Sequence, residues 1–332
     1  MFQSFYLYLA AQLLFQLSVN LCTSFRVSKL YPSYVPRGDL PREKVLDIAR
    51  RVRDLFTAKF SAVISDSADT LVITSFLGLA SLALYQNYFF VITSVRSILD
   101  VFVNACIAGI GNSLITESTE KNYKDLQKLS MLFAWLLGVS SALMLCLYQP
   151  FMTIWMGEEN LLGFSLVICF TVYYYFIGMN RLLNMFKDAA GLWHRDRFRP
   201  LTAALVNLAL NLLTVRWLGL YGVLISTVIS IVAVEFPWLL HNLFVEIFPR
   251  KQLWEYVRSF LGYVFVSAAC CFASYGVCSL VKLNVWFSFF FNAIVSFGLA
   301  NLLFFLFYGK NPLFLACFRQ IKGVALKLIK RS

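Results

Sequence analysis

The sequence predicts an all-α membrane protein, a polytopic bundle of about nine transmembrane helices. First, the chain of 332 residues is 60% hydrophobic and 14% charged, with a mean hydropathy of +0.71. A soluble domain averages about 45–50% apolar and roughly 25% charged residues. Second, apolar runs long enough to cross a bilayer recur along the chain. Third, the basic residues between these runs alternate as membrane topology signals do.

A helix needs about 20 apolar residues to cross the hydrocarbon core. Nine stretches meet this need, at 4–25, 57–78, 81–113, 129–151, 161–184, 200–217, 220–245, 259–281 and 284–308.

Lys and Arg residues are unevenly divided between the two sides that these spans define. Twenty-six of them fall on one side, and only Arg216 and Lys282 fall on the other. The basic side is predicted to be cytoplasmic, and it includes the C-terminus. An odd number of spans then places the uncharged residues 1–25 on the outside at their start. Because those residues also lack the features of a signal peptide, we expect helices to precede this chain in a longer protein.

Two segments outside the spans are distinctive. Residues 26–56 begin as a linker rich in Pro and Gly, and 43–56 place apolar residues at helical spacing, which predicts an amphipathic helix on the membrane surface. The tail over 313–331 is basic and amphipathic as well. It is equally compatible with a solvated tail behind the last span.

Several chemistries are disfavoured. The eight cysteines form no Cys-x-x-Cys pair, and there are only two histidines, so no metal site and no cofactor is predicted. The net charge of +12 is distributed between the spans, which argues against binding of nucleic acid. No nucleophile motif or phosphate-binding glycine loop is present, so no catalytic residue is predicted.

Polar residues recur at helical spacing inside three predicted spans. Charges in a membrane span are costly and normally face a cavity or one another. These candidate substrate-binding residues are Asp66 and Asp69 on one span, Arg96, Asp100 and Asn104 on the next, and Arg181 and Asn184 further along. We interpret them as the lining of a hydrophilic cavity in which the two arginines bind an anion, because guanidinium stays charged and binds phosphate through two hydrogen bonds.

Other interpretations stay open for the same residues. Arg96 has an acidic neighbour one turn away in Asp100, or across helices in Asp66 or Asp69, and pairing with it would be purely structural. Arg181 lies near the end of its span, from where its side chain can reach the interface. Asp66 and Asp69 could instead form a proton or cation site. Glu235 stands almost alone on its span.

Three stretches carry a family resemblance: DTLVITSFLGLASLALYQNYFFVITSV (69–95), QPFMTIWMGEENLL (149–162) and KDAAGLWHRDRFRPLTAALVNLALNLLTVRWLGLYGVLISTVIS (187–230). They resemble the polysaccharide flippases that move O-antigen and capsule repeat units, a family of the multidrug/oligosaccharidyl-lipid/polysaccharide exporter superfamily. The resemblance runs from about residue 20 to 310. The order and spacing of the three stretches make it moderately specific.

The resemblance implies helices 6–14 of a fourteen-helix, two-lobe exporter. Its expected parts are the last helix of an incomplete N-terminal lobe (1–25), the linker and amphipathic helix (26–56), a six-helix C-terminal lobe (57–248), two additional helices (249–308) and the basic cytoplasmic tail (309–332). It also implies that an undecaprenyl-pyrophosphate-linked oligosaccharide is flipped across the cytoplasmic membrane by alternating access. The implied partners are that lipid-linked oligosaccharide, the bilayer, and the polymerase and chain-length regulator of polysaccharide biosynthesis.

Three rival functions remain. A cation-coupled drug exporter of the same superfamily would favour acidic over basic cavity residues. A membrane polysaccharide polymerase or glycosyltransferase would need a large outer loop bearing catalytic groups, whereas the longest outer loop, 151–160, has about ten residues. This favours a transporter rather than an enzyme. A scaffold for polysaccharide assembly is the third rival.

Overall fold

The computed structural model describes residues 5–33, 38–281 and 284–319. Within these ranges the regular elements are all helices, and eight of them are long and apolar enough to cross a membrane. The predicted all-α class is therefore confirmed, and these helices have the length and composition of membrane spans, while the predicted count of about nine spans and their arrangement in lobes stay predictions. Most of the basic tail at 313–331 lies outside the described residues.

The chain forms two compact units, residues 1–50 and 51–332. The first unit contains α1 (Phe5–Leu30) and the beginning of α2 (Arg42–Thr116). Every described side chain of α1 is exposed. The predicted amphipathic stretch 43–56 is helical, and it belongs to the long helix α2 rather than standing as a separate element.

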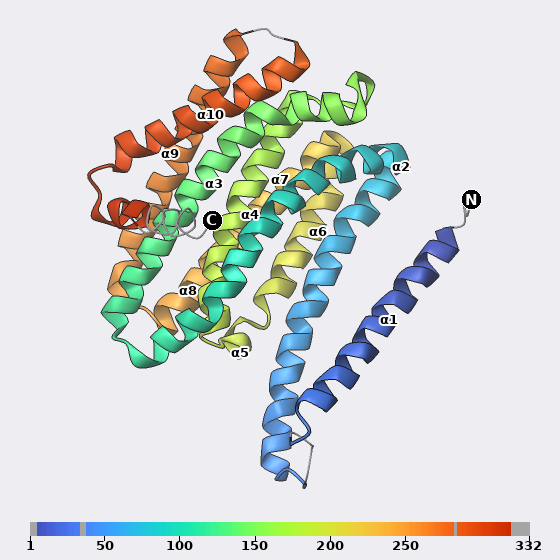
Figure 1. The fold of residues 1–332 in the computed structure, drawn as a ribbon, viewed down its shortest axis with the longest axis vertical. Helices are drawn as coiled ribbons and strands as arrows, with labels where there is room; N and C mark the ends of the chain where they lie inside the picture. The colour runs from blue at the N-terminus through green and yellow to red at the C-terminus, as the bar shows by residue number, and fades with distance from the viewer. Residues whose placement is uncertain (1–4, 34–37, 282–283, 320–332) are drawn as a thin grey trace. The chain divides into compact units, whose positions relative to one another are not determined.

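Gly78 divides α2 into two limbs. Its backbone has φ +85° and ψ +169°, a conformation that L residues other than glycine rarely adopt. The chain reverses direction at this glycine. A hydrogen bond shows it: Gln86 donates to Thr70 at 3.5 Å, although the two residues lie on opposite sides of the glycine in the sequence. Figure 1 shows the two limbs of α2 meeting at this corner. A straight helix of the 50 residues from Ser67 to Thr116 would span about 75 Å, far more than one bilayer core.

The rest of the second unit continues as an up-and-down bundle (Figure 1). Its helices are α3 (Thr119–Met156), α4 (Phe164–Ala189), the short α5 (Trp193–Asp196), α6 (Arg199–Leu218), α7 (Leu220–Ser230), α8 (Phe236–Glu246), α9 (Leu253–Leu280) and α10 (Val285–Tyr308). A π-helix, η2 (Ile231–Glu235), joins α7 to α8 within one predicted span. Two short 3-10 turns cover Glu158–Asn160 and Arg250–Gln252.

Basic residues gather at one end of the bundle. The connections over 117–118, 190–198 and 247–252 lie at this end, which we call the basic end, whereas Gly78 and Gly219 form corners at the other. Ser118 caps α3 there by accepting a hydrogen bond from the backbone of Lys121 at 3.3 Å. The alternation that the sequence predicts for these connections is thus present in the fold.

Candidate functional site

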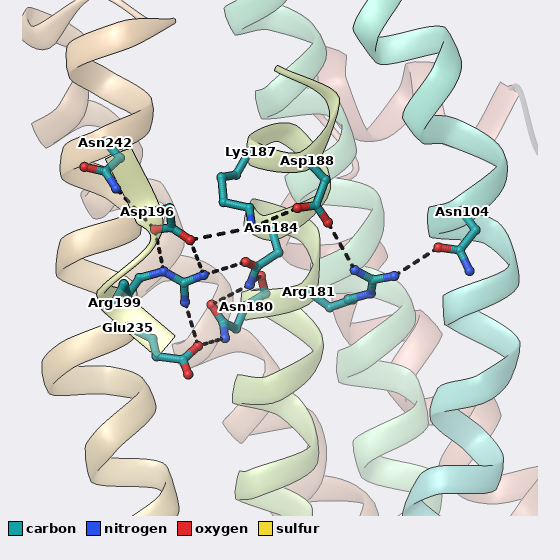
Figure 2. Close-up of polar contacts among 10 residues, drawn as sticks. All are labelled: Asn104, Asn180, Arg181, Asn184, Lys187, Asp188, Asp196, Arg199, Glu235 and Asn242. Atoms are coloured by element: carbon teal, nitrogen blue, oxygen red, sulfur yellow. Dashed lines mark hydrogen bonds and ion pairs between the residues drawn. The ribbon is translucent and has the colours of Figure 1, made fainter. Parts of the chain in front are cut away.

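A layer of paired polar side chains crosses the bundle on the basic-end side of its middle. We call it the ionic belt. It comprises Arg96, Asp100 and Asn104 of α2; Asn180, Arg181, Asn184, Lys187 and Asp188 of α4; Asp196 of α5; Arg199 of α6; Glu235 of η2; and Asn242 of α8. Figure 2 shows ten of these residues and the contacts that join them. The belt holds four cations and four carboxylates, so its formal charges cancel.

Arg199 is the centre of the belt. Its side chain is only 4% exposed, and two of its nitrogens donate to the two oxygens of Asp196 at 2.7 Å each. It also donates to Glu235 at 3.0 Å and to Asn184 at 2.8 Å. The planar guanidinium thereby joins α4, α5, α6 and η2 through one side chain, which a lysine could not do with the same geometry.

The carboxylates around Arg199 have further partners. Asn242 donates to Asp196 at 3.2 Å, and Asn180 donates to Glu235. The Lys187 ammonium lies 2.8 Å from Asp188 and 3.5 Å from Asp196, and it rests over the ring of Trp193 at 4.0 Å from the ring centre. Buried charges are tolerated when they are paired and hydrogen-bonded in this way.

Arg181 ties α4 to the second limb of α2. Its Nε donates to Asp100 at 2.8 Å, and its Nη2 donates to Asn104 at 3.0 Å. Its third nitrogen lies 3.7 Å from Asp188. Arg96 approaches the other oxygen of Asp100 at 3.7 Å, so this carboxylate is shared by two arginines and holds Arg181 more closely.

A cavity of about 380 Å³ adjoins the belt, and we call it the central cavity. α2, α4, α6, α7 and η2 all contribute to its walls. The lining includes Asp69, Tyr85, Gln86, Phe89, Thr93 and Arg96 of α2; Tyr173, Ile177 and Asn180 of α4; Ala203 and Asn207 of α6; Thr227 and Ser230 of α7; and Glu235 of η2. Its lining is therefore a mixture of aromatic rings, amides, hydroxyls, two carboxylates and one guanidinium.

Asp69 forms a second polar group at the wall of this cavity. Asn211 donates to the Asp69 carboxylate at 2.6 Å, and its amide lies 3.2 Å from that of Asn207. The Asn207 side chain also contacts the hydroxyl of Thr227 at 2.9 Å. Asn211 meets Asp69 with an N–H donor rather than an oxygen, so the proton or cation site predicted here stays a prediction.

The structure brings most of the candidate residues together. Asp100, Asn104, Arg181 and Asn184 meet in the belt, while Arg96 and Asp69 line the central cavity. The structural alternative for Arg96 is present in part, as its long contact with Asp100. The side chain of Asp66 lies outside the described residues.

Sequence reasoning missed the centre of the belt. Arg199 and Asp196 lie between the predicted spans 161–184 and 200–217, where the sequence predicts a solvated connection, yet the Asp196 side chain is 2% exposed. Their i, i+3 spacing before an apolar run was the available signal. Glu235 is not isolated, because Arg199 and Asn180 both donate to it. Asn207 and Asn211, four residues apart on α6, were overlooked because amides inside an apolar run attract less attention than charges.

Comparisons of the chain with family models, with curated proteins and with solved structures find no match. The described residues contain no group of three or more His, Cys, Asp or Glu side chains able to hold a metal ion. The walls of the central cavity present charged groups, hydrogen-bonding groups and aromatic rings.

Proposed function

We propose that the chain flips an undecaprenyl-pyrophosphate-linked oligosaccharide across the cytoplasmic membrane by alternating access. The observation that carries the proposal is Arg96, a guanidinium that lines a cavity inside a membrane-spanning bundle. Its contact with Asp100 is long at 3.7 Å, and Asp100 has a closer partner in Arg181 at 2.8 Å. Arg96 is thus the belt cation best placed to exchange a carboxylate for a phosphate.

The walls of the central cavity suit a saccharide. Tyr85 and Phe89 stack with ring centres 5.6 Å apart, and Phe89 lies 5.8 Å from Tyr173. Gln86, Asn180 and several hydroxyl groups lie among these rings. Flat apolar rings combined with a few placed polar groups are the usual way in which a pocket orients a small ligand. The sugars would meet these walls while the lipid chain remains in the bilayer.

The proposed orientation places the basic end in the cytoplasm, with the C-terminus on the same side. A cysteine at the exposed Ser118 or Arg195 should then react with an impermeant thiol reagent only after permeabilisation. A cysteine at Glu159, at the opposite end, should react in intact cells. Labelling at position 195 in intact cells would overturn this orientation.

One observation favours a second candidate, a cation-coupled exporter of the same superfamily. The cavity is lined by two carboxylates, Asp69 and Glu235, against one guanidinium. Glu235 is offset by Arg199 at 3.0 Å, so the acidic character of the cavity rests on Asp69. The two candidates differ in their substrate, and only the flippase requires Arg96 to bind a phosphate.

The deciding experiment is complementation of a strain from which the gene for this chain has been deleted. Arg96→Gln removes a charge-assisted contact worth roughly 1.5–3 kcal/mol. We expect polysaccharide export to fall about 10- to 150-fold at normal protein abundance, since each 1.4 kcal/mol is about a factor of ten. Arg96→Lys should rescue export in part, because lysine lacks the guanidinium fork.

The control is Arg216→Gln, which removes an exposed arginine at the other end of the bundle and should leave export unchanged. Normal export by Arg96→Gln at normal abundance would contradict the proposal. Low abundance that is restored by adding Asp100→Asn would assign Arg96 a structural role instead.

A further inference from the structure

A second hollow lies beyond the ionic belt, at the basic end. It has a volume of about 390 Å³ and is lined by Gly111 and Leu114 of α2, Ala189 of α4 and Glu246 of α8, among others. We call it the basic-end hollow. α2 and α4 contribute to both this hollow and the central cavity. The two spaces therefore lie along the same pair of helices.

The order of residues on α4 places the belt between the two spaces. Tyr173, Ile177 and Asn180 line the central cavity. Arg181, Asn184 and Asp188 follow and make belt contacts. Ala189 then lines the basic-end hollow.

α2 repeats this order on the opposite wall. Phe89, Thr93 and Arg96 line the central cavity, Asp100 and Asn104 bind Arg181, and Gly111 lines the basic-end hollow. On η2 the cavity wall likewise reaches Glu235, where Arg199 is bound. The belt is therefore the layer of side chains that separates the central cavity from the basic end.

The contact between α2 and α4 in this layer depends on charge. Arg181 donates to both Asp100 and Asn104, and these bonds hold the two helices together at the level of the belt. About two helical turns beyond Asn104, Gly111 leaves room for Ala189: a methyl group on Gly111 would lie 3.2 Å from the Ala189 carbonyl oxygen. Ion pairs can exchange partners, whereas close backbone packing cannot.

A weak point lies beside the belt in the neighbouring span. The π-helix Ile231–Glu235 ends at the residue that Arg199 holds, and Pro237 follows without an N–H to donate. π-segments of this kind frequently occur at functional sites, because their hydrogen-bond pattern departs from that of the flanking α-helix. The belt residue Glu235 is thus carried by an element whose hydrogen-bond pattern can change.

We propose that the ionic belt is a gate between the central cavity and the basic end, and that the Arg181–Asp100 pair is its latch. Arg96, on the cavity side of Asp100, links the latch to the ligand. When Arg96 binds an anion, it no longer competes for Asp100. Asp100 then pairs with Arg181 alone, which strengthens the closed gate. This inference deepens the proposed function, and the gate itself is independent of the identity of the ligand.

The gate is tested by access to a cysteine in the central cavity, Thr93→Cys, which lies about two helical turns from Asp100 on the cavity side. Inside-out membrane vesicles present the basic end to an impermeant maleimide, and modification of residue 93 is followed by peptide mass spectrometry, which separates it from the native cysteines. We expect slow modification in the Thr93→Cys protein. Adding Arg181→Gln or Asp100→Asn should accelerate it by at least about fivefold, the lower limit of typical coupling effects.

Two controls and one exchanged pair define the effect. Glu117→Gln removes an exposed ion pair with Lys121, which lies at 2.9 Å near the same end, and should leave the rate unchanged. Right-side-out vesicles should show no acceleration with either latch variant. The exchanged pair, Asp100→Arg with Arg181→Asp, should restore slow modification by rebuilding the contact in reverse.

An unchanged rate in Asp100→Asn from the basic end would overturn the gate. Equal acceleration from both faces, or in Glu117→Gln, would overturn it as well, because it would reveal general loosening. The measurement contains no substrate, so its outcome is distinguishable from that of the proposed function. If the latch variants accelerate modification but Arg96→Gln exports normally, the proposed function fails and the gate stands. If Arg96→Gln loses export but the latch variants do not accelerate modification, the gate fails and the proposed function stands.

Discussion

The bundle of residues 51–332 has two halves that are held together differently. In the apolar half, α3, α9 and α10 pack through rings and small residues, such as Phe304 of α10 against Gly138 of α3. In the polar half, α2, α6 and η2 meet α4 through the belt and the central cavity. Lipid tails are as apolar as these side chains, so the hydrophobic effect does not drive helices together within a bilayer. Close packing therefore holds the first half together, and polar contacts hold the second.

This difference separates a fixed part from a part that can rearrange. Packing of rings against glycine has one good geometry, because the interior is dense and tolerates little change of shape. Paired charges can exchange partners when a competing ion arrives. We therefore expect shape changes to disrupt the apolar half, and charge changes to disrupt or switch the polar half.

Arg199 should give the largest effect. Arg199→Met leaves Asp196 and Glu235 buried without their cation, and breaking a buried pair in this way costs about 3–5 kcal/mol. We expect little folded protein in membranes and a lower unfolding temperature of what can be purified. The matched variant is Arg195→Met, whose partner Glu246 lies at 3.3 Å while Arg195 is 66% exposed. That surface pair should contribute no more than about 1 kcal/mol. Equal stability of the two variants would contradict the belt as described.

Gly138 should give the next effect, in the apolar half. A methyl group there would lie 2.6 Å from the ring of Phe304 and 2.7 Å from the Ser267 hydroxyl. Gly138→Leu should destabilise the protein by about 1–3 kcal/mol through overpacking, measured as thermal unfolding in detergent. Gly276→Leu on α9 serves as the control, because nothing lies within 4 Å of a Cβ atom there. A tolerated Gly138→Leu would show that α3 and α10 do not pack as closely as the structure has them.

Asp69 should give the smallest effect, and it distinguishes cation binding from a structural role. If its oxygens bind a cation, the protein should unfold at a higher temperature in sodium chloride than in choline chloride of equal concentration. At ten times the dissociation constant the stabilisation would be about 1.4 kcal/mol. Asp69→Asn should abolish the difference between the two salts. A difference that persists in Asp69→Asn would place the cation elsewhere.

The sequence predicted what depends on local composition. Apolar runs of membrane length predicted the helices, and their spacing predicted a polar stripe containing Arg96 and Asp100. The partners of these residues depend on tertiary structure. Arg181 binds Asp100 across 81 positions of the chain, and no local pattern determines which of several carboxylates it meets.

The π-helix and the burial of Arg199 are not determined by local sequence pattern, for a related reason. Charges near the end of a span look like interfacial charges, because a single sequence does not show which of them fold back into the bundle. Asp196 and Arg199 do so because the short helix α5 turns between α4 and α6. The continuity of α7, η2 and α8 was predicted correctly as one span. The π-helix within it, which contains Glu235, was not predicted.

The most direct test of the central claim is the affinity of the purified protein for undecaprenyl pyrophosphate in mixed micelles, compared with undecaprenol. We predict that the pyrophosphate lipid binds more tightly and that Arg96→Gln weakens its binding by about 10- to 150-fold, as expected for loss of one charge-assisted contact. Arg216→Gln should bind as the parent does. Equal affinity of the parent and Arg96→Gln for the pyrophosphate lipid would contradict the account.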